Sequence, residues 1–163
     1  MSGIEGAFAA FKSICDFMQS ANLEFEVPNE ENIAFVTLKG EQFPVTLMFS
    51  VSAGSERVGT YCELPFTVKE EYELDFAKAV NAVNRVLSLG KFCYYPSEAL
   101  CSFESSEYLS GLSDFTEEYG RILVGGAYTV IQDFISPLFE VASGRMTARE
   151  IQRIAERKSK KGA

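Results

Sequence analysis

One predicted helix, with strand-type sequence on both sides, constrains the fold of this chain more than any other feature. Along residues 67–87 the apolar side chains recur with the spacing of one helix face. Thr67 and Glu70 have the spacing of a capping box, which predicts that the helix begins at Thr67, and Leu89 and Gly90 are expected to end it. We therefore expect one strand of a sheet directly before this helix and another strand directly after it.

Before this helix, apolar residues alternate with polar ones, which is typical of half-buried strands. We expect four strands, at about residues 23–27, 33–38, 43–51 and 57–64, and the short links between them favour an antiparallel meander. The third is the most hydrophobic. One of its faces carries Val45, Leu47, Phe49 and Val51, and the other carries Thr46, Met48 and Ser50.

The remaining elements surround this sheet. A first helix is expected at residues 4–21, a hairpin at 91–95 and 99–104, and a long helix at about 115–143, capped by Asp114 with Glu117 and ended by Gly144. A capping box of Thr147 and Glu150 should open a last helix to about residue 158. The fold class is thus α+β, an antiparallel sheet with helices packed on it. We expect one body over residues 1–144 and a basic helix and tail over 145–163.

Composition indicates a compact domain and excludes several kinds of chemistry. The chain has 163 residues, 47% of them hydrophobic, and no His, which excludes His-based catalysis and His-based metal sites. The four cysteines are not clustered, so we expect reduced, mostly buried thiols, with Cys93 and Cys101 the one pair to check for a disulfide. The acids at the start of the 67–87 helix are interpreted as a solvated surface. We therefore predict no catalysis, no cofactor and no bound metal.

Charge and hydropathy bear on location and partners. The net charge is −8, but residues 145–163 carry +5 and residues 1–144 carry −13. Such an acidic body argues against nucleic acid as the ligand. Apolar runs stop short of the roughly 18 residues that a membrane span needs. The N-terminus lacks the basic start of a secretory signal, so a cytoplasmic location is expected.

Two features are candidate contacts for a protein partner. Gly125 and Gly126 lie inside the long predicted helix, where two glycines would form a flat patch for close approach of another element. Arg145, Arg149, Arg153 and Arg157 recur at every fourth residue and form a basic row. That row could be a solvated face docked on the acidic body, or a surface for an acidic partner, nucleic acid or an anionic membrane.

The segment around the 67–87 helix resembles the YbjN-like family, described as bacterial sensory transduction regulators. The resemblance rests on the stretches YCELPFTV, AVNAVNRVLSLGKF and YYPSEALCSFES, followed by the small-residue helix GRILVGGAYTVIQDFISPLFEVASG. Asn81, Asn84, Leu89, Gly90 and Phe92 match the family's Asn-rich helix end and its exit into the next strand.

This resemblance implies the fold of type III secretion chaperones: helix, strand meander, helix, two strands, long helix. It further implies a non-enzymatic protein-binding or regulatory module that works as a homodimer. The alternative is a dedicated type III secretion chaperone that binds a segment of an effector. Residues expected to contact protein are Gly125, Gly126, Arg145, Arg149 and Arg153.

Overall fold

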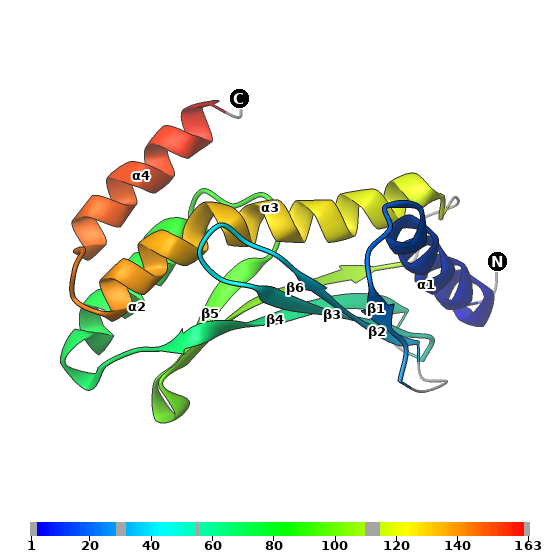
Figure 1. The fold of residues 1–163 in the computed structure, drawn as a ribbon, viewed down its shortest axis with the longest axis horizontal. Coiled ribbons are helices and arrows are strands. Elements are labelled where there is room, and N and C mark those ends of the chain that lie inside the picture. Colours follow the sequence, from blue (N-terminus) through cyan, green and yellow to red (C-terminus); the bar gives the residue numbers. More distant parts are fainter. Residues whose placement is uncertain (1–2, 29–31, 55, 110–114, 162–163) are drawn as a thin grey trace.

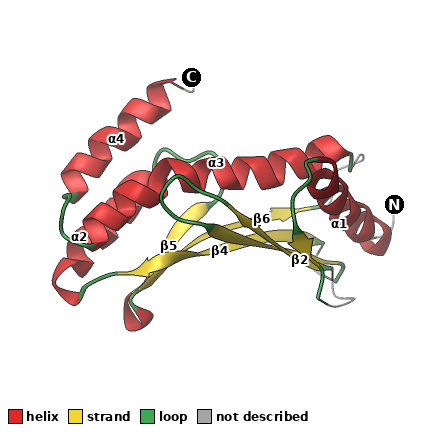
Figure 2. Cartoon of the chain, in the orientation of Figure 1, coloured by secondary structure: helices red, strands yellow, loops and turns green. Residues whose placement is uncertain are grey.

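In the computed structural model, which describes residues 3–28, 32–54, 56–109 and 115–161, helices cover one face of an antiparallel sheet (Figures 1 and 2). The described helices are α1 (Gly3–Ser20), α2 (Glu73–Asn84), α3 (Glu117–Ala142) and α4 (Ala148–Lys161), with short 3₁₀ turns η1 (Glu70–Tyr72) and η2 (Pro96–Glu98). The strands are β1 (Phe25–Glu26), β2 (Ile33–Leu38), β3 (Val45–Ser52), β4 (Arg57–Thr67), β5 (Lys91–Tyr95) and β6 (Leu100–Tyr108). They lie in the order β1-β2-β3-β4-β6-β5, with every described pairing antiparallel. The predicted fold class and meander are confirmed.

Strand β3 shows why the sheet has one buried face. Its side chains alternate between buried and more exposed along the whole strand, as its sequence predicted. The buried set consists of Val45, Leu47, Phe49 and Val51, each at most 4% exposed. These side chains face the helices and form the centre of the core, because successive residues of a strand point to opposite faces.

Helix α3 is the core helix that runs over the sheet. Ile131, Phe134 and Leu138 are among its buried residues, and they share one face of the helix. By length and composition α3 could also cross a membrane. In this fold its apolar face instead contacts α1, α2 and β4. The helix begins at Glu117, two residues after the predicted start, and the expected cap Asp114 lies outside the described residues.

Helix α1 contacts α3 at a glycine. A Cβ atom built on Gly120 would lie 2.3 Å from the carbonyl oxygen of Ser13 and 2.9 Å from the Cβ of Phe17. The Ser13 hydroxyl accepts a hydrogen bond from the Gly120 N–H at 3.1 Å and donates one to the carbonyl of Thr116. Ser13 thus supplies a cap for α3 from another helix, since Thr116 at the N-cap makes no side-chain cap bond of its own.

The start of α2 differs from the prediction. The helix begins at Glu73 after the turn η1, and Thr67 belongs to β4, where it pairs with Leu100. The backbone N–H of Val68 also donates to Ala99. The proposed Thr67 capping box is therefore wrong: pairing with the distant strand β6 extends β4 past the point where the local motif predicted a helix.

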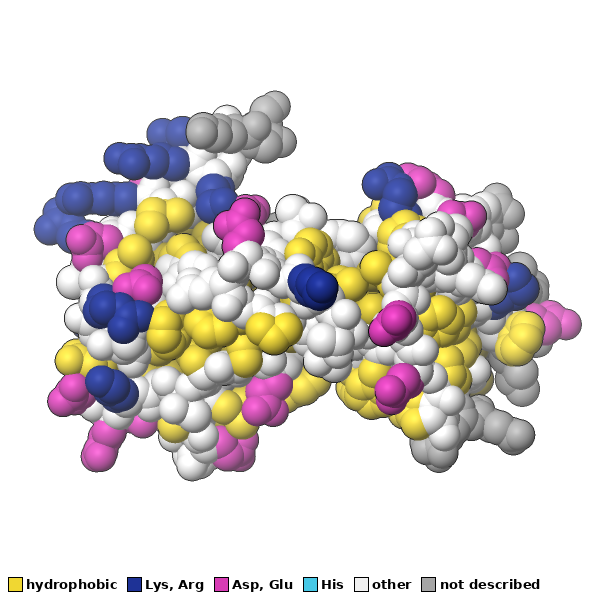
Figure 3. Space-filling model, viewed as in Figure 1, with side chains coloured by type: hydrophobic (Ala, Val, Ile, Leu, Met, Phe, Trp, Pro, Cys, Tyr) yellow, Lys and Arg dark blue, Asp and Glu magenta, His cyan; other side chains and the backbone are white. Residues whose placement is uncertain are grey.

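Helix α4 is anchored on α2 (Figure 1). Its predicted capping box forms, because the Thr147 N–H donates to Glu150 at 2.8 Å and the Glu150 N–H donates to the Thr147 hydroxyl at 3.3 Å. Asp75 of α2 accepts a further hydrogen bond from the Ala148 N–H at 2.8 Å. Ile151 and Ala155 are fully buried, while Lys and Arg side chains gather on the outer side of α4 (Figure 3).

Candidate protein-binding surfaces

The sheet face opposite the helices carries an apolar row between charged ends. Strand register aligns one residue from each strand across the whole sheet, in the order Glu26, Phe35, Met48, Tyr61, Glu104, Lys91. Phe35, Met48 and Tyr61 are half-buried and lie next to one another on β2, β3 and β4. Within the described residues no helix covers this side of the sheet (Figures 1 and 2). We call it the open face.

Glu104, the acidic residue next to the apolar part of this row, is held in place by hydrogen bonds. Glu104 accepts bonds from the Tyr95 hydroxyl at 2.5 Å and from the Ser102 hydroxyl at 2.7 Å. Burial favours a raised pKa for Glu104, but these hydrogen bonds outweigh it, so the pKa of this carboxyl lies below its usual value. The same bond to Glu104 raises the pKa of Tyr95 to about 12. Glu104 is therefore ionised at neutral pH and lies between the apolar centre of the open face and the cationic Lys91.

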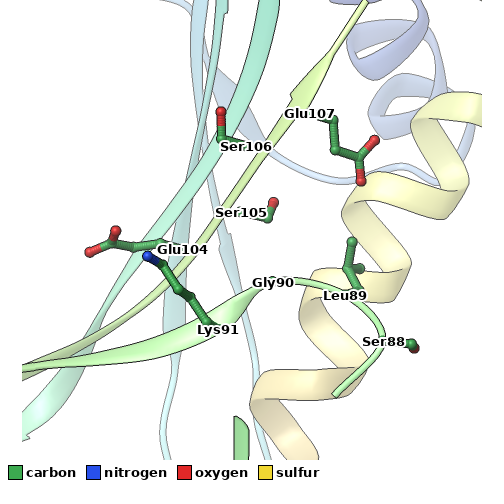
Figure 4. Close-up of a pocket in the computed structure, with 8 residues that line it drawn as sticks. All are labelled: Ser88, Leu89, Gly90, Lys91, Glu104, Ser105, Ser106 and Glu107. Carbon is green, nitrogen blue, oxygen red and sulfur yellow. The ribbon is translucent and has the colours of Figure 1, made fainter. Parts of the chain in front are cut away.

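A hollow of about 520 Å³ lies where the chain leaves α2 and enters β5 (Figure 4). Its lining consists of Ser88, Leu89, Gly90, Lys91, Glu104, Ser105, Ser106 and Glu107. Beside it, the Asn84 side chain pairs with both backbone groups of Phe92, each at 2.8 Å. This pairing satisfies the backbone of an edge strand. The family-like residues of this segment thus have structural roles.

The described residues offer no evident catalytic or metal centre. They contain no group of three or more His, Cys, Asp or Glu side chains that could hold a metal ion. All four cysteines are free, and the register places Cys93 opposite Ser102 rather than Cys101. Burial raises the pKa of Cys62 to about 12 and raises that of Cys101 as well, which makes both thiols poor nucleophiles at neutral pH.

The two predicted glycines have different surroundings. A Cβ atom on Gly126 would meet the Leu89 side chain at 2.8 Å, so the close approach at this position comes from the same chain. A Cβ on Gly125 would meet nothing within 4 Å. Of the pair, Gly125 is the one that faces open space.

The predicted arginine row is shorter than expected. Arg145 does not belong to α4, because Gly144, with φ of +76°, ends α3 in a left-handed conformation and a turn follows. Arg145 instead pairs with Glu140 at 2.7 Å. Arg149 and Arg153 do lie one turn apart on α4, and both are exposed. The structure does not gather the predicted residues at one place, since the glycines lie in α3 and these arginines in α4.

Sequence reasoning missed several residues that the structure makes important. Asp75 was interpreted as part of a solvated acidic surface, but it caps α4. Ser13 and Gly120 carried no local signal, because their roles arise from a contact between residues 107 positions apart. One feature of the sequence did point to the open face. Among the β3 side chains that face away from the core, the apolar Met48 lies between the small polar residues Thr46 and Ser50.

Comparisons with known proteins agree with this geometry. The sequence model of the YbjN family, described as "Putative bacterial sensory transduction regulator", matches residues 11–114. No curated protein sequence matches the chain.

Two solved structures share the fold. The first is YbjN from E. coli, "a putative transcription regulator", with a TM-score of 0.56 and 12% identity, covering 81% of this chain and 91% of that one. The second is the ExsC-ExsE complex, with a TM-score of 0.51 and 14% identity, covering 80% of this chain and 90% of the matched chain. Identities this low establish the shared fold alone. Because the family model matches more than half of the residues of this chain, the chain belongs to the YbjN family.

Proposed function

We propose that this protein is a non-enzymatic regulatory module that binds a segment of another protein on its open face. The observation that carries the proposal is the row of Phe35, Met48 and Tyr61 on a sheet surface that no described helix covers. Aromatic and Met side chains are enriched where proteins contact one another. At one edge the row is flanked by Glu104 and Lys91, which carry opposite charges, so the apolar residues define the character of this surface.

The fold supports a binding role. The ExsC-ExsE structure is a complex of two proteins, and one of its chains shares this fold. For this chain, a dedicated secretion chaperone that binds an effector segment is the narrower alternative, and a gene neighbourhood with secretion components would favour it. Both versions act by contact between proteins in the cytoplasm.

We also propose that the module is a homodimer that uses α3. Ile122 is 52% exposed, and Gly125, one turn further along the same helix, has open space above it. An exposed apolar side chain beside a glycine allows two helices to approach closely. Light scattering at micromolar concentration tests this: the monomer mass is 18.1 kDa, so an observed mass near that value rejects the dimer.

Partner binding is tested by pull-down and mass spectrometry with two variants. Met48→Lys with Tyr61→Lys places charge in the apolar row, whereas Ile122→Lys places charge on α3 and leaves the open face intact. We expect the first variant to lose the partner and to keep the oligomeric state, and the second to become monomeric. Partner capture that survives the first variant, in a chain whose circular dichroism is unchanged, would reject the open face as the binding surface.

A further inference from the structure

A second surface, a groove between α2 and α4, is distinct from the open face. It has a volume of about 420 Å³ and is lined by Asp75, Lys78, Asn81, Ala82, Arg85, Ala148, Arg149 and Gln152. Asp75 uses its carboxylate to cap α4, through the bond from the Ala148 N–H. This bond holds α2 and α4, the two walls of the groove, together at the end where Asp75 lies.

The charged groups left facing this groove are basic. Lys78 comes from α2, Arg85 directly follows the end of α2, and Arg149 comes from α4; all three are exposed. Within the described parts of the chain none of the three forms an ion pair, in contrast to Arg145 and Lys158. Arg153 continues the positive charge one turn further along α4, where dark-blue side chains gather in Figure 3. A protein with a net charge of −8 thus concentrates unpaired cations on one groove.

The spacing of these cations suits a row of carboxylates. Residues one helical turn apart are separated by about 6 Å, and Lys78 and Arg85, the residue that caps the end of α2, by about 10 Å along the helix axis. An acidic peptide that lies along the groove can place a carboxylate near each cation. The amides of Asn81 and Gln152, also in the lining, can donate hydrogen bonds to its backbone carbonyls or side chains.

Other anionic ligands fit this groove less well. Single-stranded nucleic acid is usually held by aromatic side chains that stack on bases, and the groove lining contains no aromatic residue. A duplex or an anionic membrane presents a broad negative surface. On α4, such a surface would meet the exposed Glu150 and Glu156 that alternate with the arginines.

We propose that the α2–α4 groove is a docking site for an acidic segment of a partner protein, bound by Lys78, Arg85 and Arg149 in the groove and by Arg153 one turn beyond its lining. This inference goes beyond the proposed function and stands whether or not the open face binds protein. The cations would bind the segment through their charge and as hydrogen-bond donors. Because dissolved salt screens the attraction between exposed charges, binding should weaken steeply as the salt concentration increases.

The test measures binding of a fluorescent oligo-glutamate peptide by anisotropy at low and high salt. One variant carries Lys78→Glu with Arg85→Glu, and a second carries Arg149→Glu with Arg153→Glu. The matched control reverses Lys39 and Lys69, which are exposed, lie outside the groove and change the net charge equally. Because each exposed ion pair contributes modestly, we expect each groove variant to weaken binding about tenfold and the control less than about twofold.

Several outcomes would overturn the proposal. Equal weakening in the control would mean that overall charge, and not the groove, attracts the peptide. Full binding in the Lys78 and Arg85 variant would reject a site shared by two helices. Tighter binding of oligo-dT or of phosphatidylserine vesicles, with the same loss in the groove variants, would assign the groove to nucleic acid or membrane. Neutral Gln substitutions at the same positions guard against misfolding, and amide NMR shifts on adding the peptide locate the contact independently.

Discussion

Substituting alanine at two glycines of α3 should change stability in opposite directions. The positions lie five residues apart in one helix, so the substitution has the same intrinsic effect at both: alanine is favoured over glycine in a helix by roughly 0.5–1 kcal/mol. What differs is the space available. A methyl group on Gly125 enters open space, while one on Gly120 meets the carbonyl oxygen of Ser13 at 2.3 Å.

The expected magnitudes follow from these surroundings. In the monomer, Gly125→Ala should stabilise the protein by up to about 1 kcal/mol, because only the helix preference changes there. In Gly120→Ala the methyl group meets the backbone of α1, which cannot rotate away as a side chain would. Overpacking of this kind costs about 1–3 kcal/mol. Separation of the two helices would also lengthen the 3.1 Å bond from the Gly120 N–H to Ser13. After the gain in helix preference of roughly 0.5–1 kcal/mol is subtracted, the net effect should be a loss of about 1–2 kcal/mol.

Chemical denaturation followed by circular dichroism measures both effects. All proteins should be compared at one concentration, because assembly would make the midpoint depend on concentration. A thermal scan should show a decrease of several degrees for Gly120→Ala, since about 1 kcal/mol corresponds to roughly 2–4 °C in a chain of this size. Stabilisation in both variants would refute the close contact between α1 and α3 at Gly120.

Four further predictions use the same denaturation assay or a thiol reagent. Ser13→Ala should cost about 1 kcal/mol, because α3 loses the two hydrogen bonds to this hydroxyl while the Gly120 N–H and the Thr116 carbonyl keep their weaker bonds within the first turn; an unchanged midpoint would contradict this. Phe76→Ala should cost about 3–5 kcal/mol, the range for a core aromatic, and a loss below about 1 kcal/mol would mean that α2 is misplaced. Asp75→Ala should cost about 1 kcal/mol and reduce helix content, because α4 loses a cap; full protection of α4 amides from exchange would contradict it. Cys62 and Cys101 should react with the reagent only on unfolding, since burial shields them and raises the pKa of both thiols; fast native labelling would exclude this packing.

The sequence predicted those parts of the fold that depend on local pattern. The alternation along residues 45–51 gave the correct buried face of β3, and the Thr147 capping box gave the start of α4. Both signals lie within a few residues of the structure that they specify. The same kind of local signal failed at Thr67, because pairing with Leu100 competes with helix formation there and is invisible in the local sequence.

The candidate surfaces were harder to predict because they combine residues that are distant in sequence. The basic row was visible on one helix, but Gly144 removed Arg145 from it, and the contribution of Lys78 and Arg85 appears only once α4 is docked on α2. The row of Phe35, Met48 and Tyr61 likewise exists only in the register of three strands. The sequence pattern of a single helix or strand predicts on which of its faces a residue lies. The packing between elements determines which other residues that residue contacts.

The contact between Ser13 and Gly120 also affects how the chain acquires its fold during synthesis. Helix α1 is synthesised before α3, yet it packs mainly on α3, and the two contact residues are 107 positions apart. Closing a loop of this length costs about 4 kcal/mol in chain entropy, and the closure must precede the contacts that reward it. The apolar side of α1 therefore lacks its main contact until α3 has been made. Helix α1 is thus made long before the helix that covers most of its apolar side, and it completes its packing late.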